Sequence, residues 1–230
     1  MAGNRLLRIL AELTARGGTG SSARLCEVSV DVLAMTGAGI MLMSEDTPRG
    51  SVCSSNDVSA RIEELQYTFG EGPCVDAYRQ DRPVLEPDLA KPATARWPAF
   101  TPPAVAAGAE AVFGFPVRVG TIRLGALNLY RDQPGVLSDD QHADALVMAD
   151  VAARAVLAAQ AKAPPDELAA ELETGGDFRF VVHQASGMVA AQLGIGVGEA
   201  LVRLRAYAFA NDRMLSDVAE DVVARRLRLE

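Results

Sequence analysis

The stretch APPDELAAELETGGD, residues 163–177, separates two parts of the chain that differ in their hydrophobic pattern. It holds two prolines and two glycines, which interrupt regular structure and favour a linker. Before it, helical patterns alternate with short β-branched and aromatic runs, whereas only helical patterns follow it. The 230 residues suffice for one large domain or two small ones. We therefore expect two domains, residues 1–162 and 178–230, joined by a linker at 163–177.

The first part combines helices with paired strands. Helical spacing occurs at 4–14, 22–35, 58–69 and 138–162, and a short helix is expected within 96–108. Strand-forming runs occur at 37–44, 50–54, 109–119 and 121–131, and Gly120 separates the last two as the turn of a hairpin. This pattern predicts an α+β fold with a central antiparallel sheet flanked by helices.

The second part predicts a small helical bundle. Apolar residues recur at helical spacing over 178–193, about 198–210 and about 215–228. Glycines separate the first two segments, and an Asn-Asp pair separates the last two. Three short amphipathic helices can bury one shared core, although some fifty residues is close to the lower limit for independent stability.

The acidic character of the chain belongs to its first part. The formal net charge is −8, and residues 1–176 carry 15 Lys and Arg against 23 Asp and Glu, whereas residues 177–230 carry 7 of each sign. Because phosphates are repelled by negative charge, non-specific nucleic-acid binding by the first part is disfavoured. The sequence has no run of 18 apolar residues and no signal-like start, so we expect a soluble cytoplasmic protein without a membrane contact.

Few residues offer catalytic or metal-binding chemistry. The chain has two histidines, His142 and His183, and no phosphate-binding, dinucleotide-binding or paired-carboxylate motif. Its three cysteines, Cys26, Cys53 and Cys74, are an odd number without C-x-x-C spacing, which argues against a disulfide framework and a zinc site. We therefore expect no enzyme, no cofactor and no bound metal.

The segment GEGPC, residues 70–74, is a candidate pocket wall. Two glycines and a proline allow sharp turns and leave amide N–H groups open to a small ligand, although a plain structural turn explains the segment equally well. A following helix N-terminus could lower the pKa of its cysteine, but a packed small residue is the simpler interpretation. The candidate ligand-binding residues are Gly70, Glu71, Gly72, Pro73, Cys74, Trp97, Phe113 and Phe115.

Arginines lie outside the apolar stripes of the second part. An arginine row on a helical bundle can bind phosphates through its guanidinium forks, or it can simply be a solvated surface. The six residues of this row are Arg203, Arg205, Arg213, Arg225, Arg226 and Arg228.

Two stretches of the chain resemble known domains. QYTFGEGPCVDAYRQ, RWPAF and FPVRVGTIRLGALNLYRDQPG resemble a bacterial GAF domain over about residues 20–160. QASGM, GEALVRLRAYA and LSDVAEDVVARRL resemble an ANTAR domain over about residues 178–228. ANTAR domains are three-helix bundles that bind paired RNA hairpins as dimers and favour antitermination of transcription. GAF domains are sensory modules that bind small ligands or mediate dimer contacts.

The resemblance implies a homodimeric, signal-responsive transcription antitermination regulator. The ligand of the GAF part is unknown. A signal received there would change the relative placement of the two ANTAR bundles of the dimer through the helix that ends near Lys162. The lysine common in the A-K-G motif of the ANTAR family is Ser186 here, and two further positions that are often basic hold Met214 and Ser216. The candidate RNA-binding residues are His183, Gln184, Ser186, Arg203, Arg205, Tyr207, Arg213, Arg225 and Arg226.

Two other functions remain open at this point. The first is a ligand-binding or dimerisation module whose ANTAR-like tail docks on a protein partner and no longer binds RNA, which the three missing basic residues favour. The second is a free-methionine sulfoxide reductase of the GAF type. That enzyme needs a cysteine pair, and Cys53 and Cys74 are the only plausible pair by spacing.

Overall fold

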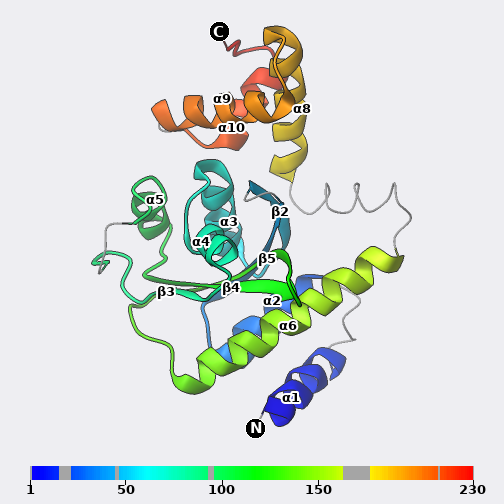
Figure 1. Cartoon of the computed structure of the whole chain (residues 1–230). Helices are drawn as coiled ribbons and strands as arrows, with labels where there is room; N and C mark the ends of the chain where they lie inside the picture. The colour runs from blue at the N-terminus through cyan, green and yellow to red at the C-terminus, as the bar shows by residue number, and fades with distance from the viewer. Residues whose placement is uncertain are drawn as a thin grey trace. The chain divides into compact units, whose positions relative to one another are not determined.

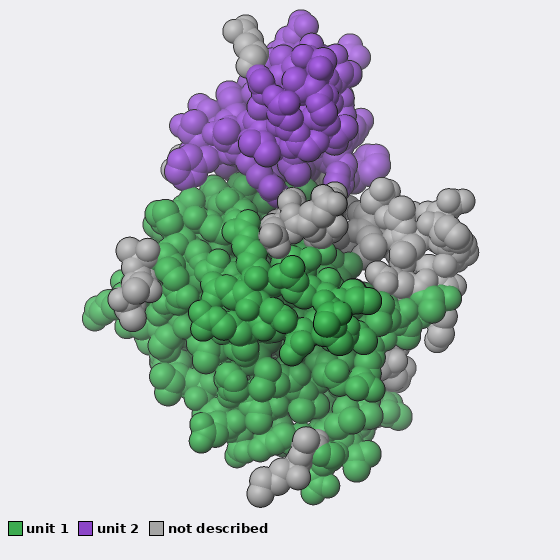
Figure 2. Space-filling view, viewed as in Figure 1, with its two compact units in different colours: residues 1–168 green, residues 169–230 purple. Residues whose placement is uncertain are grey.

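The computed structural model describes residues 2–15, 22–44, 47–92, 96–162, 177–211 and 213–229. The chain forms two compact units, residues 1–168 and 169–230 (Figures 1 and 2). Residues 163–176, which make up the expected linker apart from its last residue, lie outside the described residues. Each unit has its own buried residues.

The first unit contains the predicted antiparallel sheet. Its five strands run in the order β2-β1-β5-β4-β3, and every neighbouring pair is antiparallel. Gly120 makes the turn between β4 and β5 with φ of 58°, as expected of a hairpin. The strands are β1 Gly37–Ser44, β2 Thr47–Ser54, β3 Val84–Glu86, β4 Ala111–Val119 and β5 Ile122–Arg131.

Helices cover both faces of this sheet (Figure 1). Helices α1, α2 and α6 pack together on one face, whereas α3 and α4 pack on the other and α5 rests on α3. The α+β arrangement predicted from the sequence is confirmed. The helices are α1 Ala2–Ala15, α2 Ser22–Leu33, α3 Asp57–Phe69, α4 Pro73–Gln80, α5 Thr101–Ala106 and α6 Asp139–Lys162.

The main hydrophobic core lies between the sheet and the α2–α6 layer. Alternate residues of β4 enter it, among them Phe113 and Phe115, together with Ile40 of β1 and Leu127 of β5. The intervening Gly114 faces the other way, where a Cβ atom would lie 2.4 Å from the carbonyl oxygen of Pro73 in α4. The period-two alternation of the strands therefore separates a large apolar core from a second face on which α3 and α4 rest.

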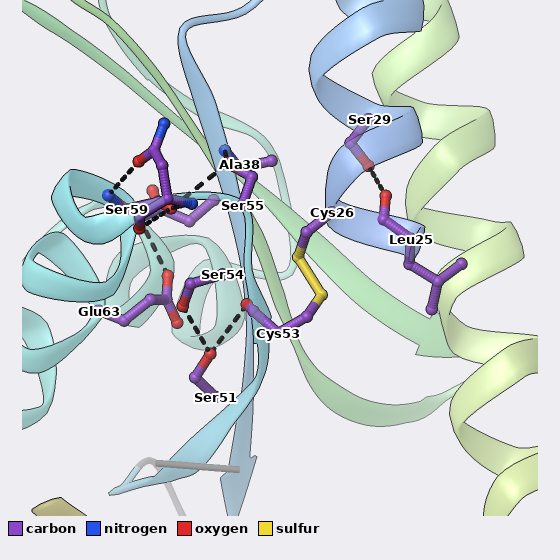
Figure 3. The surroundings of a disulfide bond; sticks show 12 residues. Leu25, Cys26, Ser29, Ala38, Ser51, Cys53, Ser54, Ser55, Ser59 and Glu63 are labelled. Carbon is purple, nitrogen blue, oxygen red and sulfur yellow. Dashed lines mark hydrogen bonds between the residues drawn. A yellow bond between two sulfur atoms is a disulfide. The ribbon is translucent and has the colours of Figure 1, made fainter. Parts of the chain in front are cut away.

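A disulfide joins Cys26 of α2 to Cys53 of β2 (Figure 3). The expectation against a disulfide was therefore wrong. Helix α2 packs on β2, which brings two cysteines 27 positions apart in sequence to a Cα separation of 6.1 Å. With an odd number of cysteines one thiol stays free, and that thiol is the buried Cys74.

The described residues of the second unit form a bundle of three helices, α8 Asp177–Leu193, α9 Val197–Ala210 and α10 Leu215–Val223. Its buried side chains include Val182 and Val189 of α8, Leu204 of α9 and Val218 of α10, so the predicted bundle is confirmed. Helix α10 ends five residues earlier than expected, because the chain turns at Arg225 with φ of 59°.

No single helix among the described residues has both the length and the apolar composition needed to cross a membrane. The segments Phe180–Leu193 and Val197–Ala210 reach that composition only when taken together, and they are bent by 106° relative to each other.

Candidate functional site

The GEGPC segment joins α3 to α4 through backbone and side-chain hydrogen bonds. Gly70 ends α3 in the left-handed region, with φ of 65°, and its N–H donates to the Gln66 carbonyl at 2.9 Å. The Cys74 N–H donates to Oε1 of the Gln66 side chain at 2.8 Å. The Cys74 amide, which we expected to be open to a ligand, therefore already has a partner within the protein.

The same segment holds the turn that carries Trp97. Oε1 of Glu71 accepts the N–H groups of Ala99 at 2.6 Å and Phe100 at 2.8 Å. The indole Nε1 of Trp97 donates to Oδ2 of Asp76 in α4 at 3.0 Å, and the ring is buried. The structure therefore brings Trp97 together with GEGPC, as the sequence predicted.

Phe113 and Phe115 do not join this group. Both rings are fully buried in the core on the α2–α6 side of the sheet, whereas GEGPC and α4 lie on the opposite side. Because side chains alternate along a strand, the residue that faces α4 is Gly114. The prediction that the two phenylalanines line a pocket beside GEGPC is contradicted by this placement.

Cys74 is a packed thiol and not an activated one. Burial raises the pKa of the Cys74 thiol well above its usual value, and the nearby charge of Glu63 raises it further. A hydrogen bond with the Gln66 side chain acts in the opposite direction but is the smallest of the three effects. Helix α4 begins at Pro73, directly before Cys74, and the net shift of the Cys74 pKa is nevertheless upward, in line with the packed residue that the sequence analysis favoured.

A buried polar cluster, Glu63, Gln66 and Asn128, lies between α3 and β5 on the GEGPC side of the sheet. The Asn128 Nδ2 donates to Oε1 of Glu63 at 3.1 Å, and Gly39 leaves room for this carboxylate, because a Cβ there would lie 2.6 Å from Oε1. All three side chains are buried. Within the described residues, Oδ1 of Asn128 and Nε2 of Gln66 have no hydrogen-bond partner. A buried water or a small polar ligand can satisfy both.

None of these three residues was among the candidates predicted from the sequence, although the sequence holds a signal for them. Glu63 and Gln66 flank Leu65 on the buried stripe of α3, and Asn128 interrupts the apolar run GALNLY. These polar residues stand at positions where the helical or strand periodicity predicts apolar ones. Such residues are candidate site residues, because burial of an amide or carboxylate needs a compensating partner.

In the second unit, several candidate arginines pair with carboxylates. Arg203 bonds Glu199 one turn earlier in α9 at 3.2 Å. Arg213 and Arg226 both bond Asp221, each at 2.7 Å. Hydrogen bonds first from Arg213 and then from Arg226 lower the pKa of the Asp221 carboxyl, and the Asp221 bond raises the pKa of Arg213.

The remaining candidates differ in exposure. His183, Gln184 and Arg225 are exposed, Arg205 and Tyr207 are half-buried, and Ser186 is buried, with its hydroxyl donating to the Val182 carbonyl at 2.8 Å. The prediction of Ser186 as an RNA contact is therefore wrong, because this hydroxyl is satisfied one turn earlier within α8.

An open depression of about 530 Å³ lies between α9 and the segment that follows α10. Two guanidinium groups and a phenol border it, and alanine and leucine side chains supply apolar wall. Arg228 was in the arginine row but not among the predicted RNA contacts; it makes no ion pair with the described residues. The lining residues are Arg203, Ala206, Tyr207, Leu227, Arg228 and Leu229.

Comparison with protein families decides the identity of both units. Residues 22–156, more than half of the chain, match the model of the GAF domain. The chain belongs to the GAF domain family. Residues 166–223 match the model of the ANTAR domain. We therefore call residues 1–168 the GAF unit and residues 169–230 the ANTAR unit. Both are regulatory kinds of domain, one sensory and the other an RNA-binding antitermination module, which favours regulation over catalysis.

Solved structures support the fold of the GAF unit. The GAF domain of an Acinetobacter phosphoenolpyruvate-protein phosphotransferase is 17% identical with a TM-score of 0.53, covering 70% of this chain and 96% of that one. The corresponding domain from Coxiella burnetii is 15% identical with a TM-score of 0.51, covering 69% and 96%. At such identities the likeness shows the fold alone. No curated protein matches the chain.

A free-methionine-R-sulfoxide reductase from Neisseria meningitidis also has this fold, at 13% identity and a TM-score of 0.51, covering 70% of this chain and 92% of that one. The reductase hypothesis required Cys53 and Cys74 to form the reactive pair. The structure contradicts that pairing, because Cys53 is bonded to Cys26 and Cys74 is a separate buried thiol.

Proposed function

We propose that the protein is a homodimeric cytoplasmic transcription antitermination regulator. In this proposal the GAF unit receives a signal, and the ANTAR unit of each copy binds one of two paired RNA hairpins. The observation that carries the proposal is the ANTAR match over a helical bundle that presents arginines beside an aromatic ring. The even balance of charge in residues 177–230 permits RNA binding there, whereas the acidic GAF unit repels it.

We assign the RNA contact to the depression that Arg203, Tyr207 and Arg228 border. Unpaired loop bases are recognised by stacking and hydrogen bonds, and phosphates by guanidinium forks. The leucine and alanine wall and the Tyr207 phenol suit a base, while the two guanidinium groups suit the adjoining phosphates. Arg228 is the stronger phosphate ligand of the pair, because Glu199 competes for Arg203.

Electrophoretic mobility shift with a tandem-hairpin RNA, against a scrambled RNA and over a salt series, tests this function. We expect the hairpin RNA to bind more tightly and its affinity to fall with salt. Replacing Arg228 with alanine should weaken hairpin binding about tenfold and reduce the salt slope by about one. Arg82→Ala is the control, because it removes the same charge from an exposed residue of the GAF unit that is not among the RNA-binding candidates. Equal binding of hairpin and scrambled RNA contradicts the proposal.

Asp221→Asn gives a second prediction with the opposite sign. The carboxylate holds Arg213 and Arg226, so neutralising it releases two guanidinium groups and removes one negative charge. We expect hairpin affinity to rise about threefold and the salt slope to steepen. A loss of affinity in a variant with unchanged circular dichroism would show that the two arginines bind RNA only in their paired positions, and unchanged affinity would show that neither contacts the RNA.

The pH dependence of stability provides an independent check on this ion-pair network. Because the folded-state pKa of Asp221 is lowered, its contribution to stability is present above the unfolded-state pKa. That contribution is lost as the pH falls through the folded-state pKa. The Asp221→Asn variant should lack this acid-dependent component, which thermal unfolding between about pH 5 and pH 2 can measure.

The alternative function is docking of the ANTAR unit on a protein partner. It is favoured by the outward face of α9, where Val202 and Phe209 are 61% and 62% exposed and lie two turns apart. The same mobility-shift experiment separates the two functions. Protein docking predicts that hairpin and scrambled RNA bind alike and that Arg228→Ala changes neither.

A further inference from the structure

We propose that Cys26 and Cys53 form a reversible thiol–disulfide site through which the redox state of small-molecule thiols controls the ANTAR unit. This inference rests on the proposed function, because an antitermination regulator acts where transcripts are made. Such a compartment is kept reducing, and disulfides found there are usually transient, catalytic or redox-sensing. The disulfide then supplies a signal for the GAF unit.

The disulfide lies at the edge of the sheet (Figure 3). Cys26 is fully buried in α2, and Cys53 is nearly so in β2, which among the described strands pairs with β1 alone. The register between β1 and β2 shifts twice, between Ile40 and Met41 and between Leu42 and Met43. An irregularly paired edge strand opens locally more readily than a central one. The sulfur of Cys53 is therefore the one that an incoming thiolate reaches first.

Both redox states are compatible with the fold. The two cysteines belong to the same core cluster as Leu25, Val28 and Ile40. This cluster lies between the sheet and the α2–α6 layer and includes residues of α6. A buried thiol packs as a small apolar side chain. Reduction therefore removes one covalent link while the surrounding hydrophobic core remains. A redox switch requires that the protein stay folded in both states, and this core supplies that stability.

The exchange is balanced with thiols of low molecular weight. A small-molecule thiolate attacks the sulfur of Cys53, the bond between the two protein sulfurs breaks, and Cys26 leaves as a thiolate that takes up a proton. A second small-molecule thiolate attacks the mixed disulfide, releasing Cys53, which also takes up a proton. The protein disulfide is reduced to two thiols, and two small-molecule thiols are oxidised to one disulfide. The reverse sequence restores the protein disulfide.

The position of the link gives it a route to the rest of the chain. It fixes α2 to β2, and α2 also packs on α6, the last helix among the described residues of the GAF unit. Helix α3, which carries Glu63 and Gln66 of the buried polar cluster, packs on β2 as well. Releasing β2 from α2 therefore loosens both the α2–α6 layer and the α3 layer.

Thiol counting on the full-length protein tests the site itself. The protein is equilibrated in glutathione buffers from fully reduced to fully oxidised, its thiols are alkylated, and the modified residues are identified by mass spectrometry. We expect Cys26 and Cys53 to change together in folded protein, and the reduced form to unfold about 5–10 °C lower. Cys74→Ala is the control, which should keep this transition, whereas Cys26→Ser and Cys53→Ser should abolish it. A disulfide that is reduced only when the protein unfolds overturns the proposal.

The coupling is tested by repeating the RNA mobility shift in both redox states. We expect hairpin affinity to differ about fivefold between oxidised and reduced protein, and not to change in the Cys26→Ser, Cys53→Ser double variant. Equal affinity in both states overturns the regulatory role. If neither state prefers hairpin RNA while the thiols titrate and hydrogen exchange in α2 and α6 changes on reduction, the RNA function fails and the redox site stands.

Discussion

Replacing Gly125 with alanine is expected to unfold the GAF unit. A Cβ atom at this position in β5 would lie 1.9 Å from the carbonyl oxygen of Met41 and 3.0 Å from the Cα of Leu42. Both atoms are backbone of β1, which cannot move away without breaking the β1–β5 pairing at the centre of the sheet. We expect a loss of more than about 4 kcal/mol, among the largest effects of single substitutions. Thermal and urea unfolding followed by circular dichroism measure it.

Gly187→Ala is the matched control. Nothing lies within 4 Å of a Cβ at this exposed position of α8, and alanine favours a helix interior over glycine by about 0.5–1 kcal/mol. The same chemical change should therefore stabilise the ANTAR unit slightly. If Gly125→Ala melted within about 2 °C of the unaltered protein, a destabilisation of less than about 1 kcal/mol, the close approach of β1 to β5 at this register would be wrong.

Local pattern was sufficient to predict the fold class and most of the elements, although α4 and β3 were not among the expected helices and strands. The hairpin of β4 and β5 follows from two β-branched runs around Gly120, and the end of α3 follows from Gly70 in the left-handed region. The three helices of the ANTAR unit follow from apolar residues that recur at helical spacing. In each case the interaction that determines the structure joins residues close in sequence. The spacing of apolar residues and the residue types at turns are therefore enough to predict these elements.

Features that depend on which faces of helices and strands pack against each other could not be predicted from local pattern. The Cys26–Cys53 link requires that α2 pack on the edge strand, and nothing in cysteine number or spacing encodes that packing. Aromatic character alone placed Phe115 beside GEGPC, whereas strand alternation turns it to the opposite face. Family resemblance made Ser186 a candidate RNA contact, whereas its buried hydroxyl donates to a carbonyl of its own helix.

Leu204→Ala should unfold the ANTAR unit while leaving the GAF unit intact. Leu204 is fully buried in the bundle core, and truncating a buried leucine costs about 2–5 kcal/mol. A unit of this size has only a few kcal/mol of stability, so the loss removes most or all of it. The core cluster described for the GAF unit runs from Ile9 to Ala153, so its transition should stay where it is.

Differential scanning calorimetry and hydrogen exchange by segment should separate the two units in this variant. We expect exchange protection to disappear from α8, α9 and α10 while the strands of the GAF unit remain protected, and hairpin RNA binding to be lost with the bundle. Val202→Ala, in the same helix but 61% exposed, is the control and should change stability by less than about 0.5 kcal/mol. Joint unfolding of both units in Leu204→Ala would contradict two independent cores. Retained RNA binding by an unfolded bundle would instead place RNA recognition outside the ANTAR unit.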